Sequence, residues 1–109
     1  MADLTDPTTV HDQLADVQIV DVREQYEWDA GHIDGAVHIV LNDLMGGAGT
    51  FDADRPVVAV CRSGNRSELA TLMLKARGLD AYNMEGGMEA WDTADLPFTA
   101  SDGATGSVA

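Results

Sequence analysis

The residues best suited to chemistry in this chain lie between Val57 and Ser67, around its single cysteine, Cys61. An apolar run rich in valine ends at Cys61, a short polar loop containing Gly64 follows, and a helical pattern then begins. This order predicts a strand, a loop and a helix, with the thiol at the carboxyl end of the strand, where open α/β sheets hold their ligands. Free backbone N–H groups of such a loop and of the first helical turn can point at an anion.

Two arginines in the same loop favour a reactive thiol. Arg62 and Arg66 add positive charge beside Cys61, and cations and helix N-termini both stabilise a thiolate. The same cradle would bind an anionic substrate, so this segment predicts a nucleophile surrounded by an anion site. A lone cysteine after a strand is, however, also typical of a small buried side chain, and the loop alone leaves that alternative open.

The length and cysteine content limit the kinds of protein that the chain can form. With 109 residues, it is long enough for one domain with its own core. One cysteine excludes an internal disulfide and a metal site with several cysteines, and His32 and His38 do not have zinc-ligand spacing, so we expect no metal and no cofactor. We see no secretory signal and no apolar run of transmembrane length, and we therefore expect a cytoplasmic protein.

The charge balance is strongly acidic. Nineteen acidic residues stand against six basic ones, for a net charge of -13, and Lys75 is the single lysine. The carboxylates are scattered along the chain, which argues against nucleic acid and anionic membranes as partners. An excess of aspartate with little lysine resembles halophilic proteins, whose surfaces repel themselves until salt screens them. Docking to a basic protein is the alternative.

Strand and helix patterns alternate along the chain. This alternation predicts an α/β fold of three layers, with a central parallel sheet of about five strands and helices on both faces. The clearest helix, 67–77, is expected to turn Leu69, Leu72, Met73 and Ala76 toward the core. We expect one domain over residues 1–98 and a flexible tail over 99–109. The expected strands are 3–5, 17–22, 36–39, 57–60 and 81–84, and the expected helical segments are 8–14, 24–30, 42–45, 67–77 and 88–91.

Three segments in order together resemble the rhodanese-like family. Asp21-Val22-Arg23-Glu24 with Tyr26-Glu27 and the run 31–36 (Gly-His-Ile-Asp-Gly-Ala) is similar to its amino-terminal signature. The loop 61–67 (Cys-Arg-Ser-Gly-Asn-Arg-Ser) is similar to its active-site loop, and the run 85–91 (Glu-Gly-Gly-Met-Glu-Ala-Trp) to its carboxyl-terminal signature. Three motifs in order are far more specific than one. The resemblance spans roughly residues 4 to 98 and is to the single-domain thiosulfate sulfurtransferases.

The resemblance implies sulfur transfer in two displacement steps. Cys61 would take the outer sulfur of thiosulfate, or of a related sulfane donor, as a persulfide and pass it to a thiol or cyanide acceptor. A thiolate needs no general base, and the backbone N–H groups of the loop would stabilise the persulfide charge. The implied substrate-binding residues are Arg62, Ser63, Gly64, Asn65, Arg66 and Ser67.

Further expectations concern the surroundings and partners of that loop. Asp21 ends a strand at the same sheet edge as Cys61, so it could touch the loop, pair with Arg23 or cap an amide, and both residues are possible supporting groups. His32 is expected to orient its own loop, and Trp28 and Trp91 to pack in or near the core. The expected partners are a small anionic sulfur donor and a thiol or thioredoxin-like acceptor, and the protein is expected to be a monomer.

Two other functions remain open from the sequence. Related phosphatases and arsenate reductases have five residues between cysteine and arginine, whereas four lie between Cys61 and Arg66. The shorter loop makes a smaller cradle, suited to a sulfur atom and tight for a tetrahedral oxyanion. A persulfide carrier or a recognition module in a larger sulfur-trafficking pathway is the second alternative, although recognition modules commonly lack the cysteine.

Overall fold

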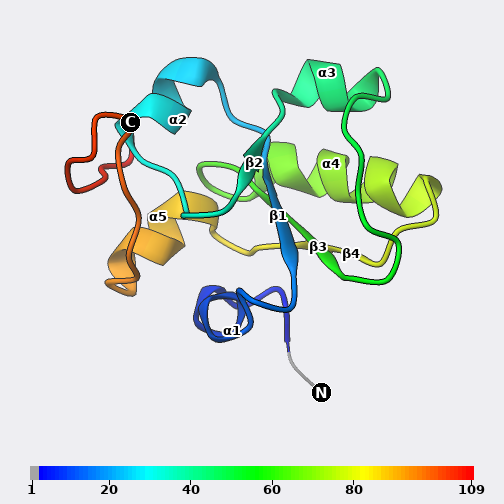
Figure 1. The fold of residues 1–109 in the computed structure, drawn as a ribbon, viewed down its shortest axis with the longest axis horizontal. Helices are drawn as coiled ribbons and strands as arrows, with labels where there is room; N and C mark the ends of the chain where they lie inside the picture. Colours follow the sequence, from blue (N-terminus) through cyan, green and yellow to red (C-terminus); the bar gives the residue numbers. More distant parts are fainter. Residues whose placement is uncertain (1–2) are drawn as a thin grey trace.

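A parallel four-stranded sheet in the order β2-β1-β3-β4 forms the centre of the computed structural model, which describes residues 3–109 (Figure 1). The central pair is in register over its full length, from Gln18 beside Val57 to Asp21 beside Val60. All carboxyl ends of the strands therefore lie at one edge of the sheet, the edge predicted for the site. The strands are β1 (Gln18–Asp21), β2 (Val37–His38), β3 (Val57–Val60) and β4 (Ala81–Asn83).

The strand predicted over residues 3–5 is wrong. The Asp3 carboxylate accepts hydrogen bonds from the Thr5 backbone N–H at 3.1 Å and from the Thr5 hydroxyl at 2.6 Å, and the Asp6 N–H donates to the Asp3 carbonyl at 3.1 Å. A short acidic side chain that bonds its own backbone two residues on makes a turn and competes with strand pairing. The described chain thus has four strands where the sequence predicted about five.

Helices cover both faces of the sheet, as the alternating pattern predicted. In Figure 1, α1 and α5 lie on one side of the strands and α3 and α4 on the other. Each pair is in contact within its own layer. Within residues 3–109, no helix is long and apolar enough to span a membrane. The helices are α1 (Pro7–Asp12), α2 (Gln25–Ala30), α3 (Leu41–Met45), α4 (Asn65–Ala76) and α5 (Gly87–Thr93).

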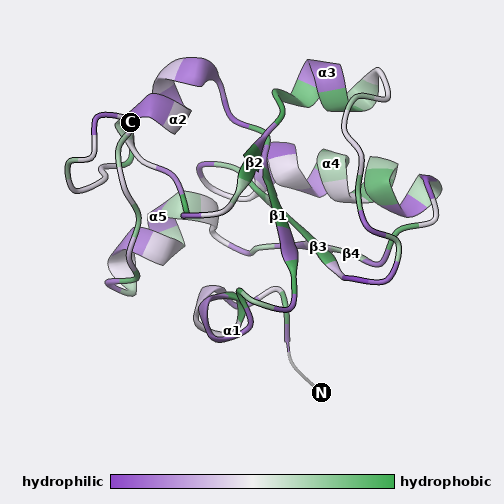
Figure 2. Cartoon of the chain, in the orientation of Figure 1, coloured by the Kyte–Doolittle hydropathy of each residue, from purple (hydrophilic) through white to green (hydrophobic). Residues whose placement is uncertain are grey.

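Strand β3 is buried on both faces and divides the core in two. Val58 and Val60 pack in the cluster that contains Trp91 of α5, whereas Ala59 and Cys61 pack in the cluster that contains Leu74 of α4. This alternation follows from the two-residue period of a strand, and burial on both faces explains why the run is continuously apolar. Figure 2 shows β3 as hydrophobic, whereas the helices have both hydrophilic and hydrophobic stretches.

Helix α4 is rotated relative to the prediction. Leu69 and Leu72 are 47% and 60% exposed, so the expected apolar face does not point at the core. The buried side chains are instead Ser67, Ala70, Thr71 and Leu74, which share one face at helical spacing. The Ser67 hydroxyl lies 3.2 Å from the Cys61 Sγ, and a helix that has Ser67 on its buried face turns Leu69 and Leu72 away from the core.

The segment 99–109, predicted as a flexible tail, has defined contacts in the structure. Thr99 and His32 exchange two backbone hydrogen bonds of 3.0 Å, and the Ser107 N–H donates to the Ala30 carbonyl at 2.9 Å. Val108 packs against the core cluster that contains Phe98. The segment therefore lies beside the end of α2, and its flexibility in solution stays a prediction.

Candidate active site

Cys61 is the first residue after β3 and is 1% exposed. Its Sγ accepts a hydrogen bond from the Gly64 N–H at 3.0 Å and lies 3.2 Å from the Ser67 Oγ. The loop therefore curls around the sulfur, as the strand–loop–helix pattern predicted. The nearly complete burial of Cys61 also fits the alternative of a small core side chain, so the environment of the sulfur must distinguish the two.

Hydrogen bonds to the sulfur lower the pKa of the Cys61 thiol. Burial is the largest single influence and raises this pKa, but it is outweighed by the Ser67 hydroxyl and by the backbone N–H groups of Ser67, Gly64 and Ser63. Ser67 is the third residue of α4, where a backbone N–H has no partner within its own helix. A thiol with this set of donors is prepared to ionise, which an inert core cysteine is not.

The segment around Gly86-Gly87-Met88 supports the loop through backbone hydrogen bonds. The Met88 N–H donates to the Cys61 carbonyl at 2.8 Å and the Glu89 N–H donates to the Arg62 carbonyl at 2.9 Å. The N–H groups in the first turn of α5 thus satisfy these loop carbonyls. The N–H groups of Ser63, Gly64 and Ser67 bond to the sulfur instead. Gly87 has φ +56°, and a Cβ there would lie 2.3 Å from the Cys61 carbonyl oxygen. The carboxyl-terminal signature thus supports the loop directly.

Arg66 is held by Glu27 of α2. Its Nη1 and Nη2 donate to the two carboxylate oxygens at 2.7 and 2.8 Å, and the Glu27 side chain is 3% exposed. The hydrogen bonds from Arg66 hold the pKa of Glu27 below its ordinary value, although burial opposes this, and the same pair raises the pKa of Arg66. Both terminal nitrogens of Arg66 are therefore bonded to a carboxylate, and the guanidinium also interacts electrostatically with Cys61.

The other predicted loop residues lie on the rim of the loop. Ser63 and Asn65 are exposed. The Arg62 guanidinium Nε lies 3.7 Å from a Glu89 carboxylate oxygen, with both side chains about half exposed. Exposed pairs of this kind contribute little to stability. Arg62 is therefore free to turn toward an incoming anion, whereas Arg66 is fixed.

Asp21 and Arg23 form a buried pair beneath α2. Arg23 Nη2 donates to Asp21 Oδ2 at 2.7 Å and to the Gly31 carbonyl at 2.7 Å, and both side chains are almost fully buried. Of the three roles open for Asp21, the structure has it paired with Arg23 and bonded to the Arg23 backbone N–H at 3.1 Å. The pair ties β1 to the end of α2, the helix that carries Glu27.

His32 and His38 each bond to a backbone carbonyl and stack on the Trp28 ring. His32 Nδ1 lies 2.9 Å from the Trp28 carbonyl, and its ring stacks on the Trp28 ring with a centroid distance of 3.6 Å. His38 Nε2 donates to the Arg23 carbonyl at 2.7 Å. Within residues 3–109, no group of three or more potential metal-binding side chains is present.

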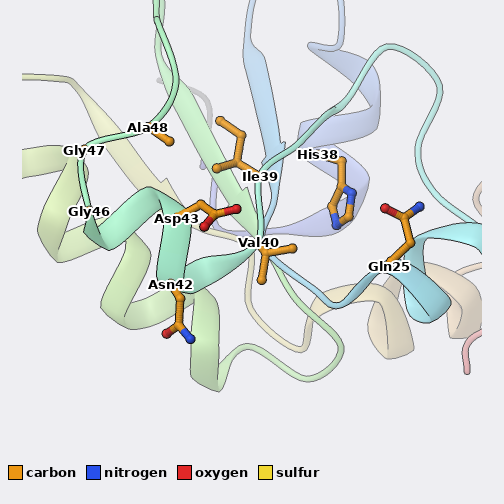
Figure 3. A pocket seen from close by; sticks show the side chains of 9 residues that line it. All are labelled: Gln25, His38, Ile39, Val40, Asn42, Asp43, Gly46, Gly47 and Ala48. Carbon is orange, nitrogen blue, oxygen red and sulfur yellow. The ribbon is translucent and has the colours of Figure 1, made fainter.

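A hollow of about 880 Å³ lies between the start of α2, the end of β2 and α3 (Figure 3). His38 and Gln25 line one end of it, and Asp43 lies toward the other. None of its lining residues belongs to the loop 61–67, so the sulfur chemistry is not placed in it. The lining residues are Gln25, His38, Ile39, Val40, Asn42, Asp43, Gly46, Gly47 and Ala48.

Asn83 is part of the site and was missed in the sequence. It is the last residue of β4, and its Nδ2 donates to the Gly64 carbonyl at 3.0 Å while its Oδ1 accepts from the Ser67 hydroxyl at 2.5 Å. The signal that could have found it is its position: β4 lies beside β3, so the end of β4 borders the loop after β3.

Comparison with known proteins agrees with this geometry. The rhodanese-like domain model matches residues 6–94. A thiosulfate sulfurtransferase, GlpE, of Shewanella oneidensis is 41% identical over 80 residues, which cover 72% of this chain and 79% of that protein. A putative sulfurtransferase, YtwF, of Bacillus subtilis is 39% identical over 82 residues, covering 75% of this chain and 80% of the relative.

Solved structures show the same fold. A rhodanese-related protein from Thermoplasma volcanium superposes with a TM-score of 0.81 at 26% identity, covering 86% of this chain and 94% of that chain. A rhodanese-like domain protein from Staphylococcus aureus has a TM-score of 0.72 at 35% identity, covering 79% and 87%. Because the family model, the relatives and the fold agree, this chain belongs to the rhodanese-like family and is a sulfurtransferase.

Proposed function

We propose that the protein moves the outer sulfur of thiosulfate to a thiol or cyanide through a persulfide on Cys61. The observation on which this rests is the arrangement around the sulfur: the Gly64 N–H donates to Sγ at 3.0 Å, and the loop hydrogen bonds lower the pKa of the thiol despite its burial. A nucleophilic thiolate with N–H donors around it is what a sulfur transfer needs.

The two steps balance without a cofactor. The Cys61 thiolate forms a bond to the outer sulfur of thiosulfate, the S–S bond of thiosulfate breaks, and its electron pair leaves with sulfite. The acceptor then forms a bond to the terminal sulfur of the persulfide, and the Cys61 thiolate leaves. In the first step the negative charge develops on the leaving sulfite. In the second step it develops on the Cys61 sulfur, beside loop N–H groups that are donors in place before the reaction.

The burial of Cys61 supports a donor that presents a single terminal atom. With 1% of the residue exposed, a bulky electrophile has little room to approach, whereas the outer sulfur of thiosulfate projects from its sulfite group. The anionic sulfite end would remain on the rim with Arg62, Ser63 and Asn65. The names of the relatives from Shewanella oneidensis and Pseudomonas fluorescens, both thiosulfate sulfurtransferases, support the same donor.

The Arg66–Glu27 pair argues against the phosphatase alternative. Cysteine phosphatases hold their tetrahedral substrate with a bidentate arginine. Here both terminal nitrogens of Arg66 are bound to Glu27 at 2.7 and 2.8 Å, so the guanidinium is not presented to an oxyanion. This contact supports the conclusion already suggested by the short loop.

A steady-state assay with thiosulfate and cyanide tests the proposal. We expect sulfite and thiocyanate to form in equal amounts, and double-reciprocal plots at several cyanide concentrations to be parallel, as in a double displacement. Cys61→Ser should abolish turnover, because a serine hydroxyl has no base here to activate it. Turnover that persists in Cys61→Ser would remove Cys61 from the mechanism. Loading by a cysteine desulfurase but not by thiosulfate would replace the donor and favour a carrier.

A further inference from the structure

The Ser67 hydroxyl lies between two acceptors but has only one proton. Its Oγ is 3.2 Å from the Cys61 Sγ and 2.5 Å from the Asn83 Oδ1. A hydroxyl donates one hydrogen bond at a time and accepts others. The two contacts therefore describe a choice: the proton of Ser67 lies either on the line to Asn83 or on the line to the sulfur.

The orientation of Asn83 in this arrangement is fixed. Its Nδ2 donates to the Gly64 carbonyl at 3.0 Å, while its Oδ1 faces the Ser67 hydroxyl. If the amide were flipped, two oxygens would face each other at Gly64, so a single orientation satisfies both contacts. Asn83 therefore offers Ser67 only an acceptor.

We propose that Asn83 is a positioning residue that sets the ionisation of Cys61 by competing for the single proton of Ser67. In the thiol state, Ser67 donates to Asn83 and accepts the S–H of Cys61. When the thiol ionises, its proton goes to solvent, and the Ser67 hydroxyl turns to donate to the thiolate. Asn83 then loses its partner, so its carbonyl favours the thiol over the thiolate. The inference rests on the proposed role of Cys61 as the nucleophile.

Formal charges near the sulfur are largely paired, which leaves these hydrogen bonds to decide. Among residues 3–109, Arg66 is bound by Glu27, Arg23 by Asp21, and Arg62 lies beside Glu89. The remaining titratable groups on the neighbouring elements are exposed, apart from Tyr82 of β4, which is partly buried and bonded to Asp80. The charged and titratable groups are Asp21 at the end of β1 and Arg23 after it, Tyr26 and Glu27 on α2, Arg62, Arg66 and Glu68 on the loop and α4, Tyr82 on β4, and Glu85 and Glu89 around the start of α5.

The single cysteine makes the test direct, because alkylation by iodoacetamide reports the Cys61 thiolate alone. The pH dependence of the alkylation rate gives the apparent pKa of Cys61. In Asn83→Ala the freed Ser67 proton should lower this pKa by about 0.5–1 unit, the effect of one hydrogen bond. Ser67→Ala should raise it, and Asn83→Ala should have no effect on the pKa in the Ser67→Ala background.

A purely structural role gives the opposite result. If Asn83 only anchors Gly64, its loss loosens the N–H donors and raises the pKa of Cys61, with or without Ser67. Either that rise, or an equal shift in both backgrounds, would overturn the proposal. Tyr82→Phe, at the adjacent position of β4, is the matched control and should leave the pKa unchanged.

A second variant covers the case in which Asn83→Ala does not fold. Asn83→Asp has nearly the same shape and offers Ser67 a stronger acceptor, although it loses the Nδ2 donor to the Gly64 carbonyl in either background. It should raise the pKa of Cys61, and at least half of that rise should disappear in the Ser67→Ala background. A rise of the same size in both backgrounds would contradict the competition. The alkylation requires no sulfur donor, so failure of thiosulfate to load Cys61 would be distinguished from failure of this inference.

Discussion

Arg66 of the loop and Glu27 of α2 are joined by two parallel hydrogen bonds of 2.7 and 2.8 Å. The same Glu27 Oε1 accepts the Glu24 backbone N–H at 3.0 Å, which closes the first turn of α2. One buried carboxylate therefore fastens the amino-terminal signature to the active loop. This explains in physical terms why Glu27 and Arg66 belong to one site although they are 39 residues apart.

Removal of the Glu27 charge should loosen the loop. In Glu27→Gln, Arg66 loses the negative charge of its partner and one of its two acceptor oxygens. We expect the free energy of unfolding to fall by about 1–3 kcal/mol, less than for a fully buried pair because Arg66 is partly exposed. Urea unfolding at pH 7 and fixed salt measures this. Glu68→Gln, on the exposed side of α4, is the control and should change stability by less than about 0.5 kcal/mol. Equal effects of the two substitutions would contradict the role of Glu27.

The contribution of Glu27 should depend on pH with a definite sign. Arg66 lowers the folded pKa of Glu27 below the unfolded value of 4.5. A lowered folded pKa stabilises the protein above the unfolded pKa, and the stabilisation is lost as the pH falls through the folded pKa. The stability difference between wild type and Glu27→Gln should be constant above about pH 5 and shrink below it. A difference that stays unchanged under acid would show that the Glu27 charge does not stabilise the fold.

Gly87 should be essential for a different reason than Gly78. Both have positive φ, +56° and +84°, but a Cβ at Gly87 would lie 2.3 Å from the Cys61 carbonyl oxygen, whereas a Cβ at Gly78 would meet nothing within 4 Å. Gly87→Ala should therefore destabilise the protein by about 2–4 kcal/mol more than Gly78→Ala and should also lower sulfur transfer. Thermal unfolding and sulfite release measure the two effects. Similar losses in both variants would mean that backbone conformation alone matters.

The sequence predicted most of the fold because β3 and its loop have strong local signals. The valine run 57–60 is buried on both faces, and Cys61 follows it as expected. The rotation of α4 was wrong because two faces of that helix have similar spacing, and the polar Ser67 gave no sign that it belongs inside. Its burial depends on Cys61 and Asn83, which are contacts that no local pattern contains.

The supporting groups of the site were harder to predict than its centre. Glu27 lies within the amino-terminal signature, but its partner Arg66 could not be predicted from the sequence. The contact depends on how the strand order of the sheet brings α2 against the loop. Met88 and Glu89 contact the loop through their backbone N–H groups, and such contacts do not depend on the type of side chain. Positions that act through their backbone or through a neighbouring strand are the ones that sequence patterns miss.

The acidic surface predicts salt dependence. With a net charge of -13, the folded protein repels itself in dilute buffer, and mobile cations relieve this repulsion. We expect the melting temperature to rise steadily from dilute buffer to molar KCl. Replacing KCl by sucrose at equal osmolality controls for general solute exclusion. Equal melting temperatures in dilute buffer and in molar KCl would contradict the prediction that the surface is adapted to high salt.

The most direct test of the account is the intact mass of the protein after mixing with thiosulfate in high salt. The account predicts a gain of one sulfur, about 32 Da, that dithiothreitol removes and that Cys61→Ser does not show. No gain in mass, with Cys61 still open to alkylation, would contradict thiosulfate as the donor. A gain that persists in Cys61→Ser would contradict the persulfide on Cys61.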